Sequence, residues 1–233
     1  MSKQREQLTD GLGRNATAEA LAHLVALRAV TYLAGPVSGR TVLDLACGDG
    51  TLSRWLAVHG AYVTGVDSSV QSIEGAKTRD AHERHGISYL AGDPQDLYMI
   101  DDSAFDDVLC NLSLGRVQNL GAAVAEVARI IRFGGRFIFS VGHPCFEQQL
   151  LGGARKPPPR HNYFAEDLRS GLFGPVRHRT LATYINAVAA RGFTVRRVLE
   201  PSAEERDVSA NPNFHAWRRA PIALVIEAVF PRL

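Results

Sequence analysis

The sequence is poor in cysteine and shows no excess of either charge. Its 233 residues include only three cysteines, and 26 Lys and Arg stand against 24 Asp and Glu, a formal net charge of +2. This balance gives no sign of a polyanionic partner such as nucleic acid. Cys47, Cys110 and Cys145 are odd in number and form no C-x-x-C pair, which argues against a disulfide framework and a zinc cluster. We expect reduced thiols and no metal site.

Long hydrophobic runs are also missing. The longest apolar stretches have the length of strands, far short of the roughly 20 residues that cross a bilayer. The start, MSKQREQLTDGLGR, lacks the apolar core of a signal peptide. We therefore expect a cytoplasmic protein without membrane attachment, a monomer or a homodimer. Hydrophobic residues make up 45% of the chain, enough for the core of one α/β domain with an elaboration.

Short apolar runs alternate with segments of helical periodicity, the pattern of a parallel sheet flanked by helices. Strands are predicted at 41–45, 61–66, 87–90, 105–109, 136–141, 193–199 and 222–230. Helices are predicted at 16–33, 51–59, 70–85, 122–131 and 181–190. Together they predict a Rossmann-like, doubly wound α/β fold with a seven-stranded sheet, mostly parallel with the last strand antiparallel, and helices on both faces. The rhythm breaks at 142–176, where Pro157, Pro158 and Pro159 mark a long insertion after the fifth strand.

The most informative segment follows the first predicted strand, in VLDLACGDGTLSRWL. The strand ends at Leu45 and a helix begins near Thr51, so Gly48 and Gly50 lie in the turn between them. Glycine allows a tight turn and lets the backbone approach a ligand without an intervening Cβ. At the carboxyl end of a first strand, this turn lies beside the crevice in which open α/β sheets bind ligands.

Two kinds of nucleotide-like ligand compete for this turn. A dinucleotide favours G-x-G-x-x-G, but Ser53 stands at the third glycine position, and Asp49 adds negative charge where a pyrophosphate would lie. A ligand with a sulfonium and an ammonium group suits Asp44 and the carbonyls of the turn. The pattern therefore disfavours an NAD(P)-dependent oxidoreductase.

Asp67 ends the second predicted strand, in GVDSS, 17 residues after Gly50. A carboxylate at this place can accept hydrogen bonds from both hydroxyls of a ribose. The alternative is an acidic N-cap for the next helix, because Asp is common at such caps. Ser68 or Ser69 can fill that role instead.

Four segments in this order resemble the class I S-adenosylmethionine-dependent methyltransferases, in particular their small-molecule members. They are VLDLACGDG, GVDSS, AGDPQDL and EVARIIRFGGRFIFS. The resemblance covers about residues 20–145, and 179–230 more loosely. Ala46 and Phe133 depart from the glycine and proline usual at those places. A single domain over 1–233 is implied, with an N-terminal helical cap (1–35), a cofactor-binding core (36–142), an insertion or substrate lid (143–178) and the rest of the core (179–233).

The resemblance also implies S-adenosyl-L-methionine as cofactor and S-adenosyl-L-homocysteine as product. Asp67 would bind the ribose, Asp93 and Pro94 would flank the adenine, and Asn111 and Leu112 would contact the methionine part. The cofactor-binding residues that it implies are Asp44, Ala46, Cys47, Gly48, Gly50, Asp67, Ser68, Asp93, Pro94, Asn111 and Leu112.

Methyl transfer needs proximity and alignment, and a base only where the nucleophile is acidic. His143, at the carboxyl end of the fifth strand, is the candidate base, although a histidine before Pro144 can simply hold the turn. Tyr163 is a weaker catalytic candidate. Six Lys and Arg between Arg155 and Arg179 suggest either an anionic acceptor or, preferably, a solvated basic loop. The candidate substrate residues are His143, Phe146, Tyr163, Phe164, His178 and Tyr184.

The leading hypothesis is a methyltransferase acting on an O, N or C nucleophile of a small molecule. A second is a methyltransferase-like protein that binds the cofactor without transferring methyl, as a partner-activating subunit or a cyclisation catalyst. An RNA methyltransferase is disfavoured, because Asn111 and Leu112 are not followed by the proline and aromatic residue usual for a base amine.

Overall fold

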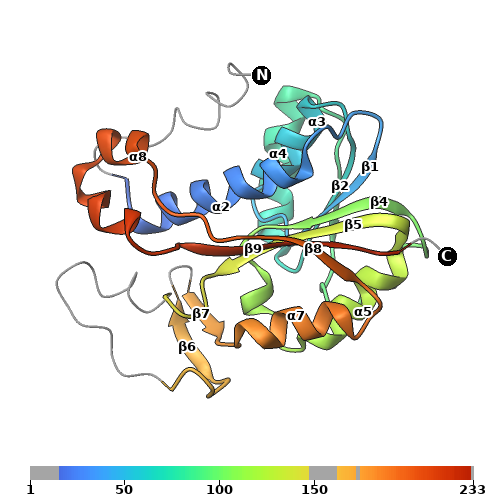
Figure 1. Ribbon diagram of the computed structural model, residues 1–233. Helices are drawn as coiled ribbons and strands as arrows, with labels where there is room; N and C mark the ends of the chain where they lie inside the picture. The colour runs from blue at the N-terminus through green and yellow to red at the C-terminus, as the bar shows by residue number, and fades with distance from the viewer. Residues whose placement is uncertain (1–15, 147–161, 172–173, 232–233) are drawn as a thin grey trace.

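The computed structural model describes residues 16–146, 162–171 and 174–231. Seven strands form the main sheet, in the order β3-β2-β1-β4-β5-β9-β8 (Figure 1). They are β1 (Thr41–Leu45), β2 (Tyr62–Asp67), β3 (Ser88–Ala91), β4 (Phe105–Cys110), β5 (Ile131–Gly142), β8 (Thr194–Leu199) and β9 (Ala223–Val229). Strands β1 to β5 pair in parallel, and β9 is antiparallel to both of its neighbours. The predicted fold class is confirmed.

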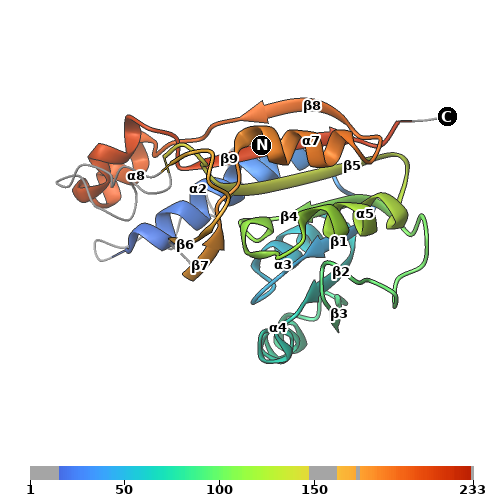
Figure 2. The same ribbon diagram turned by 90° about the horizontal axis from the view of Figure 1, so that it is seen from below.

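Helices cover both faces of the sheet (Figures 1 and 2). They are α2 (Ala18–Ala34), α3 (Thr51–Val58), α4 (Val70–Glu83), α5 (Leu120–Ile130), α7 (Leu181–Ala189) and α8 (Glu205–Ala210), with short 3-10 helices η1 (Leu114–Arg116) and η2 (Pro212–Arg218). Side chains of α2 and α3 form one apolar cluster with the sheet, and those of α5 and α7 form another. Leu43 and Leu109 are fully buried in these two layers. The layers hold the carboxyl ends of β1, β2 and β4 at one edge of the sheet.

The fifth strand is longer than the predicted range of 136–141, and the glycine pair Gly134-Gly135 lies inside it. Strand β5 begins at Ile131 and α5 ends one residue earlier. The Gly134 N–H donates to the Phe230 carbonyl, and the Phe230 N–H donates to the Gly135 carbonyl. Hydrogen bonds to Phe230, near the C-terminal end of the chain, thus extend β5 at its start. The local sequence around two glycines cannot indicate such a distant contact.

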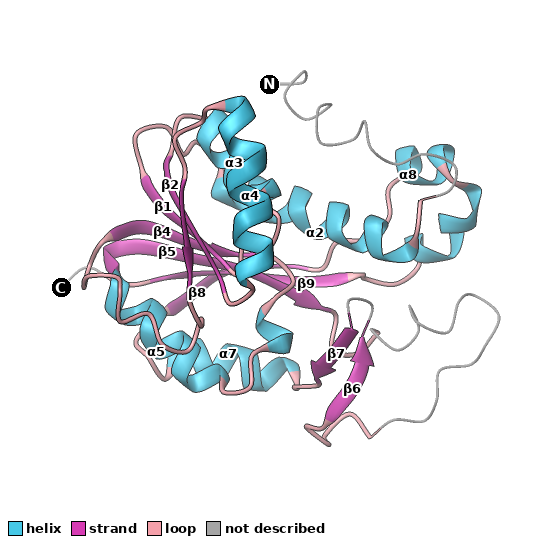
Figure 3. Cartoon of the chain, turned by 180° about the vertical axis from the view of Figure 1, so that it is seen from behind, coloured by secondary structure: helices cyan, strands magenta, loops and turns pink. Residues whose placement is uncertain are grey.

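The insertion after β5 contains a hairpin, β6 (Leu168–Gly171) with β7 (Gly174–Arg177), which forms a second sheet beside the first (Figure 3). This hairpin, α8 and η2 were not predicted. The triple proline 157–159 lies outside the described residues. Within the described residues, no helix has the length and hydropathy needed to cross a membrane.

Candidate active site

A cavity of about 170 Å³ opens at the carboxyl ends of β1 and β4. Six of the eleven residues predicted to bind the cofactor line this cavity. The lining residues are His23, Asp44, Ala46, Cys47, Gly48, Asp49, Thr51, Leu52, Asn111, Leu112, Ser113 and Arg116. The turn after β1 and the turn after β4 therefore form a common wall, as parallel strands with adjacent carboxyl ends require.

The glycine turn has the conformation that its sequence predicts. Gly48 and Gly50 have φ angles of 54° and 78°, in the left-handed region that favours glycine. A Cβ on Gly48 would meet no atom within 4 Å, so this backbone faces open space in the cavity wall. On Gly50 a Cβ would lie 2.5 Å from the Tyr89 hydroxyl. Gly48 thus leaves room for a ligand, whereas Gly50 leaves room for the Tyr89 side chain.

Asp44 is a buried carboxyl group in this cavity, only 1% exposed. Its Oδ2 accepts a hydrogen bond of 2.5 Å from Ser53 Oγ, so the residue that replaces the third glycine of a dinucleotide motif supports Asp44. Burial raises the pKa of Asp44 to about 7, even though the Ser53 hydrogen bond opposes the shift. A cationic group in the cavity would stabilise the ionised form.

Asp67 lies where β2 ends and links the two neighbouring turns. Its carboxylate accepts from the N–H of Gly48 at 2.9 Å and from the N–H of Ser69 at 2.8 Å. Ser69, not Asp67, is the N-cap of α4, because its hydroxyl accepts from Ser72 N–H. The helix-cap interpretation of Asp67 is therefore wrong, and its carboxylate is held by backbone donors beside the cavity.

The other predicted cofactor residues lie on the loops next to this cavity. The Gly92 N–H donates to the Asp67 carbonyl, which joins the loop after β3 to the end of β2. Asp93 is exposed and accepts from the backbone and side-chain amides of Gln95, whereas Pro94 is buried. Ser68 is exposed on the loop that follows Asp67. The ribose and adenine contacts of these residues stay predictions.

Asn111 presents an unpaired donor at the opposite wall. Its Oδ1 accepts from Ser140 Oγ at 2.6 Å, and its Nδ2 is buried without a hydrogen-bond partner. The next residue, Leu112, has a φ of 55° and donates its N–H to Ser140 Oγ at 2.9 Å. A buried amide without a partner is costly, so a ligand oxygen in the cavity is the expected acceptor for Asn111.

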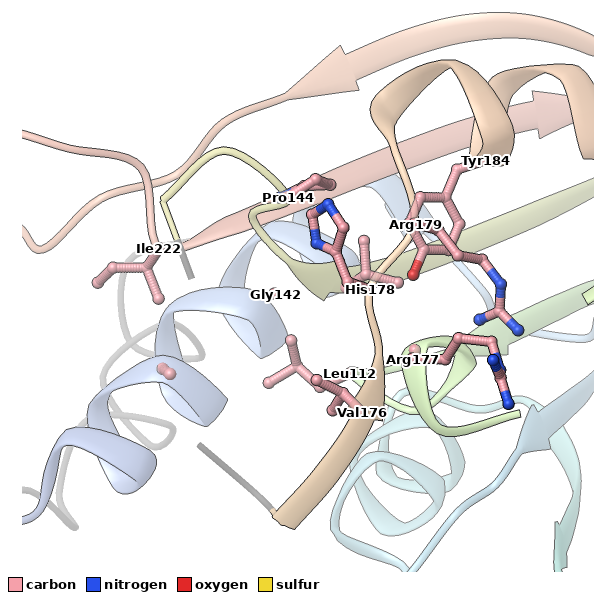
Figure 4. Close-up of a pocket in the computed structure, with 12 residues that line it drawn as sticks. Leu112, Gly142, Pro144, Val176, Arg177, His178, Arg179, Tyr184 and Ile222 are labelled. Atoms are coloured by element: carbon pink, nitrogen blue, oxygen red, sulfur yellow. The ribbon is translucent and has the colours of Figure 1, made fainter. Parts of the chain in front are cut away.

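A second, smaller pocket of about 30 Å³, which Figure 4 shows, adjoins the first, because Leu112 lines both. Two of the predicted substrate residues, His178 and Tyr184, line this pocket. The complete lining is Ala22, Leu112, Gly115, Val141, Gly142, Pro144, Val176, Arg177, His178, Arg179, Tyr184 and Ile222. Its volume admits one or two waters, so only the reacting end of an acceptor would enter it.

His143 is 2% exposed and does not line either pocket. Its Nε2 lies 2.7 Å from a Glu200 carboxylate oxygen, and its Nδ1 accepts from the Cys145 N–H at 3.3 Å. The ring of Phe146 packs against it at 5.0 Å. Both nitrogens are thus engaged by the protein. These contacts favour the second role that the sequence analysis gave to His143, that of holding the turn before Pro144. They disfavour its role as a base, which stays a prediction.

Tyr163 and Phe164 are placed outside the small pocket as well. The Tyr163 hydroxyl accepts from the Leu181 N–H at 2.8 Å, at the start of α7, and its carbonyl lies 2.9 Å from His178 Nε2. Phe164 is 80% exposed and packs edge-on against Tyr163. Tyr163 therefore positions His178 and α7, and neither aromatic ring lines the pocket.

Several lining residues were missed by the sequence analysis. Ala22 and His23 come from α2, which crosses the sheet and reaches both cavities. Arg177 is the last residue of the unpredicted hairpin, and Arg179 follows it. The excess of Lys and Arg in the insertion was a weak signal for the two arginines. No sequence signal indicated that α2 reaches the site. Among the described residues, no group of three or more His, Cys, Asp or Glu could hold a metal ion.

Comparison with known proteins agrees with this geometry. Residues 43–139 match a family model described as a methyltransferase domain. An S-adenosylmethionine-dependent methyltransferase of Mesorhizobium loti is 28% identical with a TM-score of 0.75, covering 91% of this chain and 99% of that one. A Listeria monocytogenes protein assigned to the same class is 27% identical, with a TM-score of 0.79 and the same coverage. Residues 43–139 therefore carry a methyltransferase domain, and the fold of the chain is that of S-adenosylmethionine-dependent methyltransferases.

The chain also resembles curated enzymes over part of its length. It is 36% identical over 114 residues to the ubiquinone biosynthesis O-methyltransferase of Coxiella burnetii, 49% of this chain and 48% of that protein. The chain spans about half the length of the curated relatives it matches. The predicted family is confirmed, and S-adenosylmethionine is the cofactor that this family uses.

Replacing Asp67 by alanine is expected to weaken the binding of S-adenosylmethionine by about tenfold or more, since each charge-assisted hydrogen bond contributes roughly 1.5 to 3 kcal/mol. Calorimetric titration measures the dissociation constant. Asp101→Ala removes the same charge from an exposed loop before β4 and serves as the control. An unchanged dissociation constant in Asp67→Ala would refute the assignment of Asp67 to the ribose.

Proposed function

We propose that this protein transfers a methyl group from S-adenosylmethionine to an O, N or C nucleophile of a small molecule and releases S-adenosylhomocysteine. The observation that carries the proposal is the shared wall at Leu112. Leu112 lines both the cavity of the cofactor turn and a narrow pocket lined by His178 and Tyr184, so the two cavities adjoin. Adjoining cavities can bring two ligands into contact, which an in-line displacement requires.

The residues of the larger cavity fit the methionine part of the cofactor. The buried Asp44 carboxyl suits an ammonium group, and the unpartnered Asn111 Nδ2 suits a carboxylate. Gly48 leaves the turn open to a ligand. When bound, the cofactor supplies an electrophilic methyl group on a cationic sulfur. The protein's own task is to align the acceptor and, for an acidic nucleophile, to accept a proton.

His178 is the proton acceptor that the geometry supports best. Its Nε2 lies 2.9 Å from a carbonyl oxygen, which can only accept, so Nε2 carries the ring proton and Nδ1 carries a lone pair. Burial lowers the pKa of His178 below its ordinary value, which keeps the ring neutral at neutral pH. A neutral imidazole that lines the acceptor pocket can take a proton from a hydroxyl or an ammonium nucleophile.

The names of the curated relatives support a small-molecule acceptor. They are ubiquinone biosynthesis O-methyltransferases, whose methyl acceptor is an oxygen, and their similarity covers about half of each protein. The narrow pocket agrees with an acceptor smaller than a nucleic acid, because a flipped nucleobase with its backbone needs a wider opening. We therefore place a metabolite ahead of RNA.

The test uses S-adenosylmethionine with an isotopically labelled methyl group. Incubation of the protein with a small-molecule metabolite extract is expected to place label in one or a few metabolites and to form S-adenosylhomocysteine. A parallel incubation with bulk RNA should stay unlabelled. Label in RNA alone would contradict the small-molecule acceptor. Tight binding of NAD(P) without any response to S-adenosylmethionine would contradict the whole proposal.

A further inference from the structure

The described lining of the acceptor pocket includes two arginines. Arg177 and Arg179 line it, and none of the twelve described lining residues is Asp or Glu. Figure 4 shows both side chains extending to the same side of the pocket. Arg177 ends β7, which packs against η1, so the hairpin of the insertion fixes its position. Two guanidinium groups therefore lie on one side of this pocket.

Arg179 is a buried cation held only by neutral groups. It is 4% exposed, and its guanidinium donates to the carbonyls of Leu114, Val117 and Gln118 at 3.2, 2.6 and 3.1 Å. No salt bridge to Arg179 occurs within the described residues. A buried charge without a counter-ion is costly. The three carbonyls orient the Arg179 guanidinium but do not neutralise its charge.

Arg177 is half-buried, and its side chain has no hydrogen bond or ion pair within the part of the chain that the structure describes. Other shielded arginines of this protein are paired. Arg28 bonds to Asp207 at 2.8 Å, and Arg169 bonds to Asp167 at 2.5 Å. Arg169 belongs to the same hairpin, so the described part of the insertion supplies a carboxylate to Arg169 and none to Arg177. A solvated basic loop does not explain this difference.

We propose that the methyl acceptor carries an oxyanion, a carboxylate or a phosphate, which Arg177 binds while the uncompensated charge of Arg179 raises the local positive potential. This inference rests on the proposed function and narrows its substrate class. A guanidinium fork matches the two oxygens of such an anion, and the apolar side chains of Val141, Val176 and Ile222 shield the pair from water.

The labelled-methyl incubation tests this directly when its products are separated on an anion exchanger at neutral pH. The labelled product is expected to be retained by the exchanger. Treatment of that product with a phosphatase then separates the two sources, because only a phosphate ester loses its retention. A labelled product that is neutral or cationic would overturn the inference while leaving the methyltransferase activity in place. No labelled product in any fraction would instead remove the proposed function on which the inference rests.

The role of Arg177 is tested with the acceptor that the labelling experiment identifies. Arg177→Gln is expected to raise KM for that acceptor by about tenfold or more and to leave the dissociation constant of S-adenosylmethionine unchanged. Arg191→Gln is the matched control, because Arg191 is exposed and precedes β8 at the other edge of the sheet. Arg177→Lys should recover part of the affinity, since it restores the charge without the fork. A KM in Arg177→Gln equal to that of the control would overturn the role of Arg177.

Discussion

Replacing His178 by glutamine is expected to lower kcat by about 10² to 10⁴ for an acceptor whose nucleophile must lose a proton. Glutamine can still donate to the Tyr163 carbonyl, which holds His178 at 2.9 Å, but its other polar atom is not a base of comparable strength. Cofactor binding should not change, because His178 lines the acceptor pocket and not the cofactor cavity. Steady-state kinetics together with calorimetric titration of the cofactor separate the two effects.

The pH profile gives a second readout for His178. Because burial lowers its pKa, the neutral form is present at and above the ordinary imidazole value, and turnover should fall only at more acid pH. The Gln variant should lose this acid limb. A variant that keeps both full turnover and the acid limb would show that another group, or no group, accepts the proton.

His143→Gln is the matched control for His178→Gln, since both change a buried histidine to glutamine. The bonds of His143 to Glu200 and to the Cys145 N–H predict a loss of stability of about 1 to 2 kcal/mol and a change in kcat of less than tenfold. Thermal unfolding and kinetics measure the two quantities. A fall of 10² or more in kcat with unchanged stability would return the base role to His143.

The two histidines illustrate how far the sequence could lead. A histidine at the end of the fifth strand is a reasonable candidate base, because that end faces the ligand edge in open α/β sheets. The partner that engages it, Glu200, lies 57 positions later, and no local pattern indicates that contact. His178 could be placed on the acceptor side, but its tautomer depends on a carbonyl of the insertion.

The candidate cofactor residues around the larger cavity could be proposed from the sequence because their signals are local. The turn of Gly48 and Gly50, the buried Asp44 and the strand-ending Asp67 all lie within a few residues of strands with clear apolar runs. The acceptor half depends on contacts between distant segments. Helix α2 reaches the site over the sheet, and the β6–β7 hairpin carries Arg177 into the pocket. Neither arrangement follows from periodicity, since periodicity predicts elements and not which loop covers which edge.

Asp44 is expected to make binding of S-adenosylmethionine depend on pH. Its pKa of about 7 means that the carboxyl group is largely protonated below neutral pH, and only the ionised form attracts an ammonium group. Affinity should therefore rise by up to about tenfold per pH unit as the pH approaches 7, and then level off. Asp44→Asn should abolish this rise and bind the cofactor about a hundredfold more weakly at pH 8. Isothermal titration between pH 5 and 8 measures both effects.

Two controls assign the pH dependence. His23 and Asp49 also line the cavity, and a protonated His23 would repel the same ligand, so His23→Gln is measured alongside. The rise with pH should survive in His23→Gln and vanish in Asp44→Asn. S-adenosylhomocysteine keeps the ammonium but lacks the sulfonium. If Asp44 acts on the ammonium, both ligands show the same slope, and a slope seen with S-adenosylmethionine alone would place its effect on the sulfonium.

The same carboxyl group should lower the stability of the free protein at neutral and alkaline pH. Burial raises the pKa of Asp44 above its unfolded value of 3.8, so its stabilising contribution is complete below pH 4 and is lost as the pH rises to about 7. Asp44→Asn avoids the cost of a buried charge, which amounts to at most about 4 kcal/mol, while keeping a group of the same shape. Thermal unfolding without cofactor should show a gain in Tm for Asp44→Asn that is larger at pH 8 than at pH 5. Equal Tm values for the wild-type protein and Asp44→Asn at pH 8 would mean that burying the ionised Asp44 carboxylate has no cost. The proposed pH dependence of cofactor binding through Asp44 would then be contradicted as well.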